Sequence, residues 1–415
     1  MRSIFEKKGL RFIFAANLIS MIGSGMNSAS VAWYILEATH SEMALGTLAV
    51  VQTLPAILLL PFSGVVIDRE DRRRLVMVLD SLRALVIAVV AVLAFTGKAK
   101  LWELYAMNML VAAGFWMFWP TVTALLQELT PGDEFVAANT FLLAGVQGGW
   151  LVAGAMVGFV YNQIGLAGVL ALDVTSYAIS FLCYLAVRRG RHVVRRPPEP
   201  YSSGRAAAES APGKFFRELG EGVRFLRGHR ELVWLGASWA LFLSAMMTGV
   251  VVTAPLSDFI YHKGAVGYGW LNGGWGVGAF VSAFYAPGFI RRFGARRSIA
   301  ISLAMLAVLM ASAPRMPWFG LAVAVYAAMG SGRGITGVAI NTRLMEQIPQ
   351  HFMGRVQNIF YFAGTILQVS QAYLVGALAE NNLIAGFSVI GFVYAMGFLS
   401  AAWPVRVGQP AEVTE

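Results

Sequence analysis

The feature that most constrains this chain is a series of long apolar segments that recurs from one end to the other. A helix needs about 20 apolar residues to cross the hydrocarbon core of a bilayer. Apolar residues make up 57% of the 415 residues and charged residues only 13%, against roughly 45–50% and 25% in soluble domains. We therefore expect an all-α integral membrane protein.

On this rule the sequence predicts twelve transmembrane helices in two sets of six. The first set covers about 12–36, 43–67, 75–96, 101–127, 135–160 and 166–187. The second covers about 232–258, 267–290, 298–314, 318–342, 353–379 and 383–405. A long polar stretch separates the sets. The predicted domains are an N-terminal bundle (1–187), a cytoplasmic linker (188–230), a C-terminal bundle (231–406) and a cytoplasmic tail (407–415).

The orientation follows from the basic residues. Of the 32 Lys and Arg residues, 26 fall in the even-numbered connections and the two tails. Cytoplasmic loops carry the excess of positive charge. We predict a multi-pass protein of the cytoplasmic (inner) membrane with both termini in the cytoplasm, and the same asymmetry accounts for the net charge without a nucleic-acid partner.

Part of the linker has helical periodicity. Between 214 and 230, Phe215, Leu219, Val223 and Leu226 recur near helical spacing among four arginines. This pattern is typical of an amphipathic helix on the inner membrane face. A solvated connector is the alternative.

Several classes of chemistry find no support in the sequence. Cys183 is the only cysteine, and the five histidines do not recur at the spacing of a zinc site. No nucleophile–base pair stands out. We expect no metal, no cofactor and no enzymatic activity.

Two pairs of segments indicate a duplicated chain, which is a signature of transporters. The segment 64–74 after the second span resembles 288–297 after the eighth, since both begin with Gly and contain four Arg. The segment 130–139 before the fifth span likewise resembles 348–358 before the eleventh. The two halves are therefore predicted to be pseudo-symmetric.

The loop after the second span carries a family resemblance. Gly64, Asp68, Arg69, Arg72 and Arg73 match the G-x-x-x-D-R-x-x-R-R loop of the major facilitator superfamily. The resemblance implies the major facilitator fold and a secondary transporter. The segments 119–128, 172–177 and 221–227 look like the branch that contains macrolide exporters, enterobactin exporters and lysophospholipid transporters.

The same resemblance implies a conformational gate. Asp68, with Arg72 or Arg73, would latch the second, fourth and eleventh helices when the cytoplasmic side is closed. The predicted gate residues are Asp68, Arg69, Arg72, Arg73 and Glu128. A carboxylate beside several guanidinium groups can make charge-assisted hydrogen bonds there. The alternative is that the arginines only set the topology.

Four ionisable residues lie inside predicted spans, where charge is costly and points to function. Asp80 and Arg83 lie three apart, so we expect them to pair. Asp173 could carry a coupling proton or make a structural hydrogen bond. Arg333 is expected to face a central cavity and to bind an anionic substrate group or a carboxylate of another helix; the alternative is packing against carbonyls near Gly332 and Gly334.

Two departures from the pattern of drug–proton antiporters leave proton coupling open. The fifth span has glycines at 145, 148, 149, 154 and 158, but it lacks the Gly-Pro pair of the antiporter motif. The fourth-span arginine of those antiporters is also absent, because Asn108–Ala113 contains no basic residue. The glycines are expected to permit close helix packing.

Substrate is expected near mid-bilayer between the halves. Amides and deep tryptophans are the further candidates for the cavity wall: Asn17, Asn27, Gln52, Gln147, Asn272, Asn341, Gln368, Gln371, Trp116, Trp119, Trp150, Trp239 and Trp275. That mixture suits an amphipathic molecule. The sequence predicts a monomeric efflux transporter that works by alternating access among membrane lipids. The alternatives are a lysophospholipid or lipid transporter, an importer of a small polar metabolite, and a membrane scaffold or receptor that transports nothing.

Overall fold

The computed structural model describes residues 8–130, 135–187 and 211–403, and within these ranges it is helical throughout, without a strand. The N-terminal half contains α2 (Lys8–Thr39), α3 (Glu42–Arg69), α4 (Arg72–Phe95), α5 (Leu101–Leu129) and α6 (Phe135–Ala186). The linker contains α7 (Ala211–Arg227). The C-terminal half contains α8 (Arg230–Thr248), α9 (Val250–Pro255), a π-helical turn (Leu256–Ile260), α10 (Gly264–Phe293), α11 (Ala295–Ser312), a 3-10 turn (Ala313–Arg315), α12 (Phe319–Gln347), α13 (Gln350–Asn381) and α14 (Leu383–Ala402).

These elements make twelve membrane-spanning helices, as predicted. Ten segments among the described residues are long and apolar enough to cross a bilayer. The segment that includes most of α6 holds two of the twelve spans, because Gly165 has φ 63 and ψ −173 and turns the chain back. The remaining span is α10, a helix of 30 residues. Helices suit the bilayer core because it contains no water to hydrogen-bond the backbone N–H and C=O groups, and a helix satisfies these groups internally.

The seventh span differs from the single helix expected at 232–258. Helix α8 ends at Thr248, α9 follows from Val250 to Pro255, and a π-helical turn continues to Ile260. Proline has no backbone N–H and disturbs the regular ladder of helical hydrogen bonds. Tyr261 N–H donates instead to the Leu256 carbonyl, at 3.2 Å. The span is therefore an interrupted helix.

The two halves repeat each other down to single backbone conformations. His40 follows the first helix of the N-terminal half with φ 49, and His262 follows the first span of the C-terminal half with φ 50. A non-glycine residue with positive φ is uncommon. The two histidines therefore mark equivalent turns of a duplicated chain.

The glycines of the fifth span do bring helices close together. An added Cβ at Gly149 would lie 2.7 Å from Met21 on α2, and one at Gly158 would lie 2.8 Å from the Val266 Cα on α10. Gly149 thus lets α6 pack closely against α2 of its own half, and Gly158 lets it pack closely against α10 of the C-terminal half.

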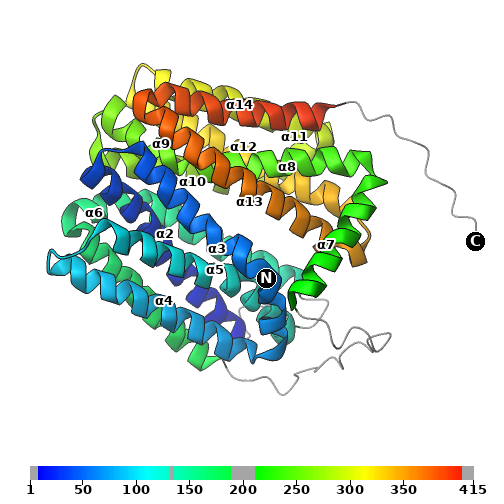
Figure 1. The fold of residues 1–415 in the computed structure, drawn as a ribbon, viewed down its shortest axis with the longest axis horizontal. Helices are drawn as coiled ribbons and strands as arrows, with labels where there is room; N and C mark the ends of the chain where they lie inside the picture. Colours follow the sequence, from blue (N-terminus) through cyan, green and yellow to red (C-terminus); the bar gives the residue numbers. More distant parts are fainter. Residues whose placement is uncertain (1–7, 131–134, 188–210, 404–415) are drawn as a thin grey trace, which may run out of the picture.

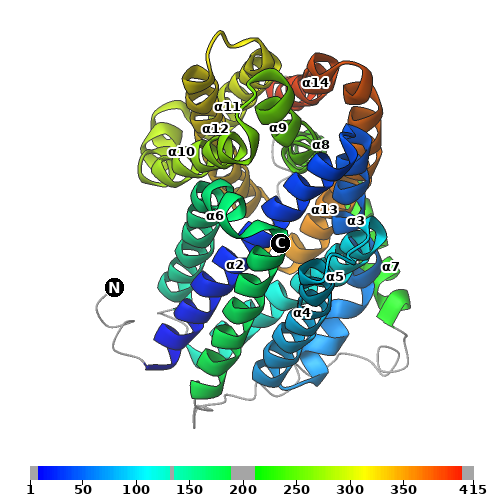
Figure 2. The same ribbon diagram turned by 90° about the vertical axis from the view of Figure 1, so that its left-hand side faces the viewer.

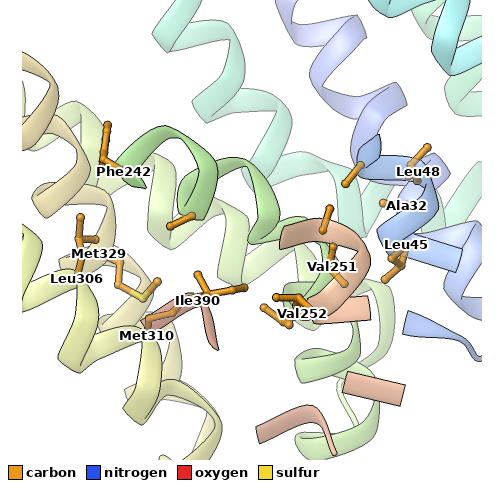
Figure 3. Packing of buried hydrophobic residues seen from close by; sticks show 14 of the residues in the cluster. Ala32, Leu45, Leu48, Phe242, Val251, Val252, Leu306, Met310, Met329 and Ile390 are labelled. Atoms are coloured by element: carbon orange, nitrogen blue, oxygen red, sulfur yellow. The ribbon is translucent and has the colours of Figure 1, made fainter. Parts of the chain in front are cut away.

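Figure 1 shows the N-terminal half, blue to teal, beside the C-terminal half, green to red. One hydrophobic cluster runs through both. In Figure 3, Val251 and Val252 of α9 lie between Ala32 and Leu45 of the N-terminal half and Ile390 of the C-terminal half. The interrupted seventh span therefore helps to hold the halves together.

The halves meet at the ends of their helices that are remote from the arginine-rich loops. At that end Ser41 Oγ donates to Glu380 Oε1 at 2.6 Å; nearer the middle of α13, Gln368 Nε2 donates to the Ala49 carbonyl at 3.4 Å. Both hydrogen bonds join the N-terminal half to the C-terminal half. Under the predicted orientation, this end would be the outer side.

Helix α7 packs beside α13 at the opposite end, where the arginine-rich loops lie (Figures 1 and 2). Glu221 pairs with Arg355 at 2.9 Å, and the Phe225 ring stacks on Phe352 at 4.6 Å between centroids. The amphipathic segment of the linker is thus a helix that is held against the C-terminal half.

Candidate functional site

A central cavity of about 510 Å³ lies between the two halves. Ligand sites in proteins commonly measure about 300–1,000 Å³. Polar and aromatic side chains of both halves line it: Ser24, Asn27, Ser28, Gln52, Thr53, Asn108, Phe115, Trp116, Gln147, Trp150, Tyr177, Thr253, Tyr268, Asn272, Trp275, Phe280, Tyr326, Arg333, Gln368 and Tyr394. The C-terminal half adds Met246, Met247, Met310 and Met329. Flexible thioethers adapt to varied apolar shapes.

Seven of the residues selected from the sequence for the cavity lie on this wall: Gln52, Trp116, Gln147, Trp150, Trp275, Arg333 and Gln368. Asn27 and Asn272 lie there too. The amides are partly engaged with one another, because Gln52 Nε2 donates to Asn108 Oδ1 at 2.9 Å. The N-terminal wall therefore combines amide donors and acceptors with two tryptophans.

Six selected residues lie off the wall: Asn17, Trp119, Asp173, Trp239, Asn341 and Gln371. Gln371 is buried and accepts a hydrogen bond from Ser244 Oγ. Asn17 is fully buried and donates to the Tyr184 hydroxyl at 2.9 Å. Trp119 packs in the core of the N-terminal half, and Trp239 packs edge-on against Phe360 and Tyr361. Asn341 is exposed and bonds its own helix. The structure places these residues away from the wall because depth in the membrane, on which they were selected, does not fix the direction of a side chain.

Asn108 and four tyrosines were not selected from the sequence, although they lie on the wall. Tyr177, Tyr268, Tyr326 and Tyr394 are almost fully buried. Tyrosine in a membrane protein usually lies at the lipid–water interface. For Tyr177, Tyr326 and Tyr394, a position well inside a predicted span was the available signal, whereas Tyr268 lies at the start of its span.

Arg333 contributes the one charged side chain among the described residues of the wall. It lies mid-way along α12 and is partly exposed. Its Nε donates to the Met246 Sδ at 3.1 Å, and no described carboxylate pairs with it. The glycines around it serve close packing with other helices: a Cβ at Gly330 would lie 2.9 Å from the Ala279 nitrogen on α10, and one at Gly332 would lie 3.1 Å from Leu306 Cγ on α11. The structure therefore turns Arg333 toward the cavity, as the first alternative predicted.

The second intramembrane arginine is paired. Arg83 and Asp80 form a buried ion pair, which confirms the pairing predicted from their spacing. Asp80 also accepts from Ser180 Oγ at 2.7 Å. The Arg83 guanidinium lies 4.4 Å from the centre of the Phe118 ring and 4.6 Å from that of Tyr177. Only the phenol ring of Tyr177 belongs to both this cluster and the cavity wall.

Asp173 lies behind the wall. Its carboxylate accepts from Asn27 Nδ2 at 2.7 Å and from Ser176 Oγ at 3.2 Å. Asp173 is fully buried, while Asn27 reaches the cavity. Gly23 leaves the space for the carboxylate, since a Cβ there would lie only 2.5 Å from Asp173 Oδ1. One amide thus separates a buried carboxylate from the cavity.

The gate residues lie at the arginine-rich ends of α3, α4 and α5. Arg72 is 3.5 Å from Glu128. Arg73 donates from Nε to the Tyr184 carbonyl and from Nη2 to the Leu185 carbonyl, both at 2.7 Å. The side chains of Asp68 and Arg69 lie outside the described residues. Arg72 and Arg73 are therefore held within the N-terminal half.

Residues 13–372 match the sequence model of the Major Facilitator Superfamily. The chain belongs to this superfamily. It is therefore a membrane-spanning transporter of the superfamily, as the loop motif and the fold predicted.

Among curated members of the Major Facilitator Superfamily, the chain is 25% identical to an uncharacterized MFS-type transporter, YkuC, of Bacillus subtilis, over 86% of this chain and 82% of that protein. It is 22% identical to the multidrug efflux pump Tap of Mycolicibacterium fortuitum, over 90% of each chain. It is 23% identical to macrolide efflux protein A of Streptococcus pyogenes, over 61% of this chain and 59% of that protein.

Solved structures of the superfamily fold agree with this architecture. A bacterial homologue of the iron transporter ferroportin, in an inward-facing state, superposes with a TM-score of 0.70 at 15% identity, over 95% of this chain and 98% of that chain. The nucleoside transporter NupG superposes with a TM-score of 0.69 at 12% identity, over 94% and 97%. At this identity the likeness shows the fold alone.

Proposed function

We propose that this transporter exports an amphipathic small molecule across the cytoplasmic membrane by alternating access. The observation that carries the proposal is the central cavity, where amides, tryptophans and tyrosines of both halves share the wall with four methionines of the C-terminal half. Such a wall offers both hydrogen bonds and adaptable apolar surface to one ligand. Efflux proteins among the relatives support the direction.

The conformation supports the same cycle. The halves are closed by Ser41–Glu380 and by the close contact of Gly158 with α10, at the end we assign to the outside. An exporter loads its substrate from the inside, so this is the loading state. Rocking of the two bundles about the cavity would then open the outer side.

We also propose that Asp173 binds a coupling proton. Asn27 joins this carboxylate to the cavity, and the Asp80–Arg83 pair lies within electrostatic reach of it. Asp80, Arg83 and Asp173 together carry a net charge of −1 when all three are ionised, and one proton on Asp173 would neutralise it.

Transport by purified protein in proteoliposomes tests the proposed function. The probes are erythromycin, 2-naphthalenesulfonate, uridine and a fluorescent lysophosphatidylethanolamine. An exporter of amphipathic molecules is expected to move erythromycin or the sulfonate faster than empty liposomes do. Uridine transport alone would favour a polar importer, lysolipid movement alone would favour a lipid transporter, and no movement of any probe would favour a scaffold.

A further inference from the structure

The charge on the cavity wall is of one sign only, among the residues that the structure describes. The wall carries the cation of Arg333 and no carboxylate among its described residues. The buried carboxylates near it, Asp80 and Asp173, are fully enclosed and are already hydrogen-bonded to Ser180 and Asn27. A cationic ligand in the cavity would therefore meet a positive charge and no direct counter-ion.

The guanidinium itself is available. Its Nε rests on the sulfur of Met246, a weak acceptor, and no described acceptor takes its two terminal nitrogens. By contrast, Arg83 is enclosed and paired with Asp80. A planar guanidinium with two free N–H groups can bind two oxygens of a carboxylate, sulfonate or phosphate at once.

The surroundings of Arg333 are apolar and aromatic. Trp275, Tyr326 and Tyr394 share the C-terminal wall with Met246 and Met329. An unpaired cation in such surroundings is costly until an anion or water reaches it. The opposite wall offers the amides of Gln52 and Gln147.

From this arrangement we infer that the cavity selects an amphipathic organic anion. The anionic head binds the terminal nitrogens of Arg333, the apolar body lies on the aromatic rings and methionines, and polar groups of the body face the amides of the N-terminal half. This inference rests on the proposed function and names its substrate class.

Equilibrium binding to the full-length protein in lipid nanodiscs tests the inference. Three tritiated probes share one ring system and differ in charge: 2-naphthalenesulfonate, its neutral sulfonamide, and the trimethyl-2-naphthylammonium cation. The parent is expected to bind the sulfonate about tenfold or more tightly than the sulfonamide, as one charge-assisted contact allows. The cation should bind most weakly, although aromatic rings alone can attract a cation.

Substitution of the arginine separates charge from packing. Arg333→Gln should remove the preference for the sulfonate and leave sulfonamide binding within about twofold. Arg333→Lys keeps the charge but loses the planar fork, so part of the preference should remain. Arg315→Gln, in the turn between α11 and α12, is the matched control and should bind like the parent.

The inference is overturned if the parent binds the three probes equally, or binds the cation most tightly, because this comparison needs no variant to fold. It is also overturned if Arg333→Gln weakens all three probes by the same factor, which would indicate a packing role. If the protein transports erythromycin but shows no preference for the anionic probe, export of amphipathic molecules still holds and only the anionic substrate class is refuted. If the protein binds the anion but transports none of the probes, the proposed export is refuted, whereas the anion site at Arg333 is supported.

Discussion

Arg73 in the N-terminal half and Arg296 in the C-terminal half each donate hydrogen bonds to the carbonyl groups that end the last helix of their own half. Arg73 reaches the carbonyls of Tyr184 and Leu185, and Arg296 reaches those of Ala401 and Trp403. The last carbonyls of a helix have no partner within it and carry the negative end of its dipole. The duplicated arginine-rich loops therefore cap helix ends.

Removal of either cap should destabilise the fold. For Arg73→Ala and for Arg296→Ala we expect a loss of about 1–2 kcal/mol in the free energy of unfolding, the range for hydrogen bonds with a charged partner. Thermal unfolding in one detergent measures the loss. Arg74→Ala is the control, because Arg74 is exposed and uses its backbone N–H to bond Asp71. Equal losses for all three variants would contradict the capping role.

The buried pair Asp80–Arg83 should show the behaviour of an enclosed ion pair. Asp80→Asn leaves the guanidinium without a counter-charge, and we expect a loss of about 3–5 kcal/mol. The double variant Asp80→Leu with Arg83→Met removes both charges and should lose less than the single variant. Unfolding by titrated denaturing detergent compares them. A double variant less stable than Asp80→Asn would show that the pair itself supplies the stability.

Much of the fold could be predicted from the sequence, because length and hydropathy set each span and the spacing of basic residues sets the pattern of loops. The cavity was predictable only in part. Gln52 and Asn17 are both amides inside spans, yet the first lines the cavity and the second bonds Tyr184. Transmembrane helices are apolar on every side, so periodicity does not report which side faces the cavity.

Arg333 could be placed because its charge limits the choices, whereas Tyr177 and Asn108 could not. A guanidinium must find water, a carboxylate or carbonyls. A phenol or an amide can be satisfied within its own helix or by one neighbour, as Asn108 is by the Leu104 carbonyl. Only the packing of helices distinguishes these cases.

The close contact of the halves at Gly158 should be sensitive to one methyl group. A Cβ there would lie 2.8 Å from the Val266 Cα, whereas a Cβ at Gly148 would lie 3.9 Å from the Leu18 side chain. We expect Gly158→Ala to lose about 1–3 kcal/mol and Gly148→Ala to lose little. Because the halves would separate at this end, a cysteine at Ser41 should react faster with a maleimide in Gly158→Ala. An unchanged rate would show that the strain is absorbed within α10.

The gate loop carries a prediction that depends on sequence alone. Asp68→Asn removes the charge that would latch the cytoplasmic side, while the length and apolarity of the span stay the same. We expect normal expression and thermal stability with transport reduced at least about tenfold, as loss of a charge-assisted bond allows. Normal transport of the proteoliposome probes by Asp68→Asn would show that the loop only sets the topology.

The proposed proton site can be tested without knowledge of the substrate. Asp173 is fully buried and bonds Asn27 and Ser176, so a proton on it would appear as a carboxyl group shielded from water. Infrared difference spectra of the parent between acidic and alkaline buffer should contain the C=O stretching band of such a group. Asp173→Asn keeps the shape of the side chain but cannot exchange this proton, so the band should vanish. Glu103→Gln is the control, because Glu103 caps the start of α5 in an exposed position. If the band survives in Asp173→Asn and is lost in Asp80→Asn, the proton belongs to Asp80, and the role of Asp173 is to hold Asn27 in the cavity wall.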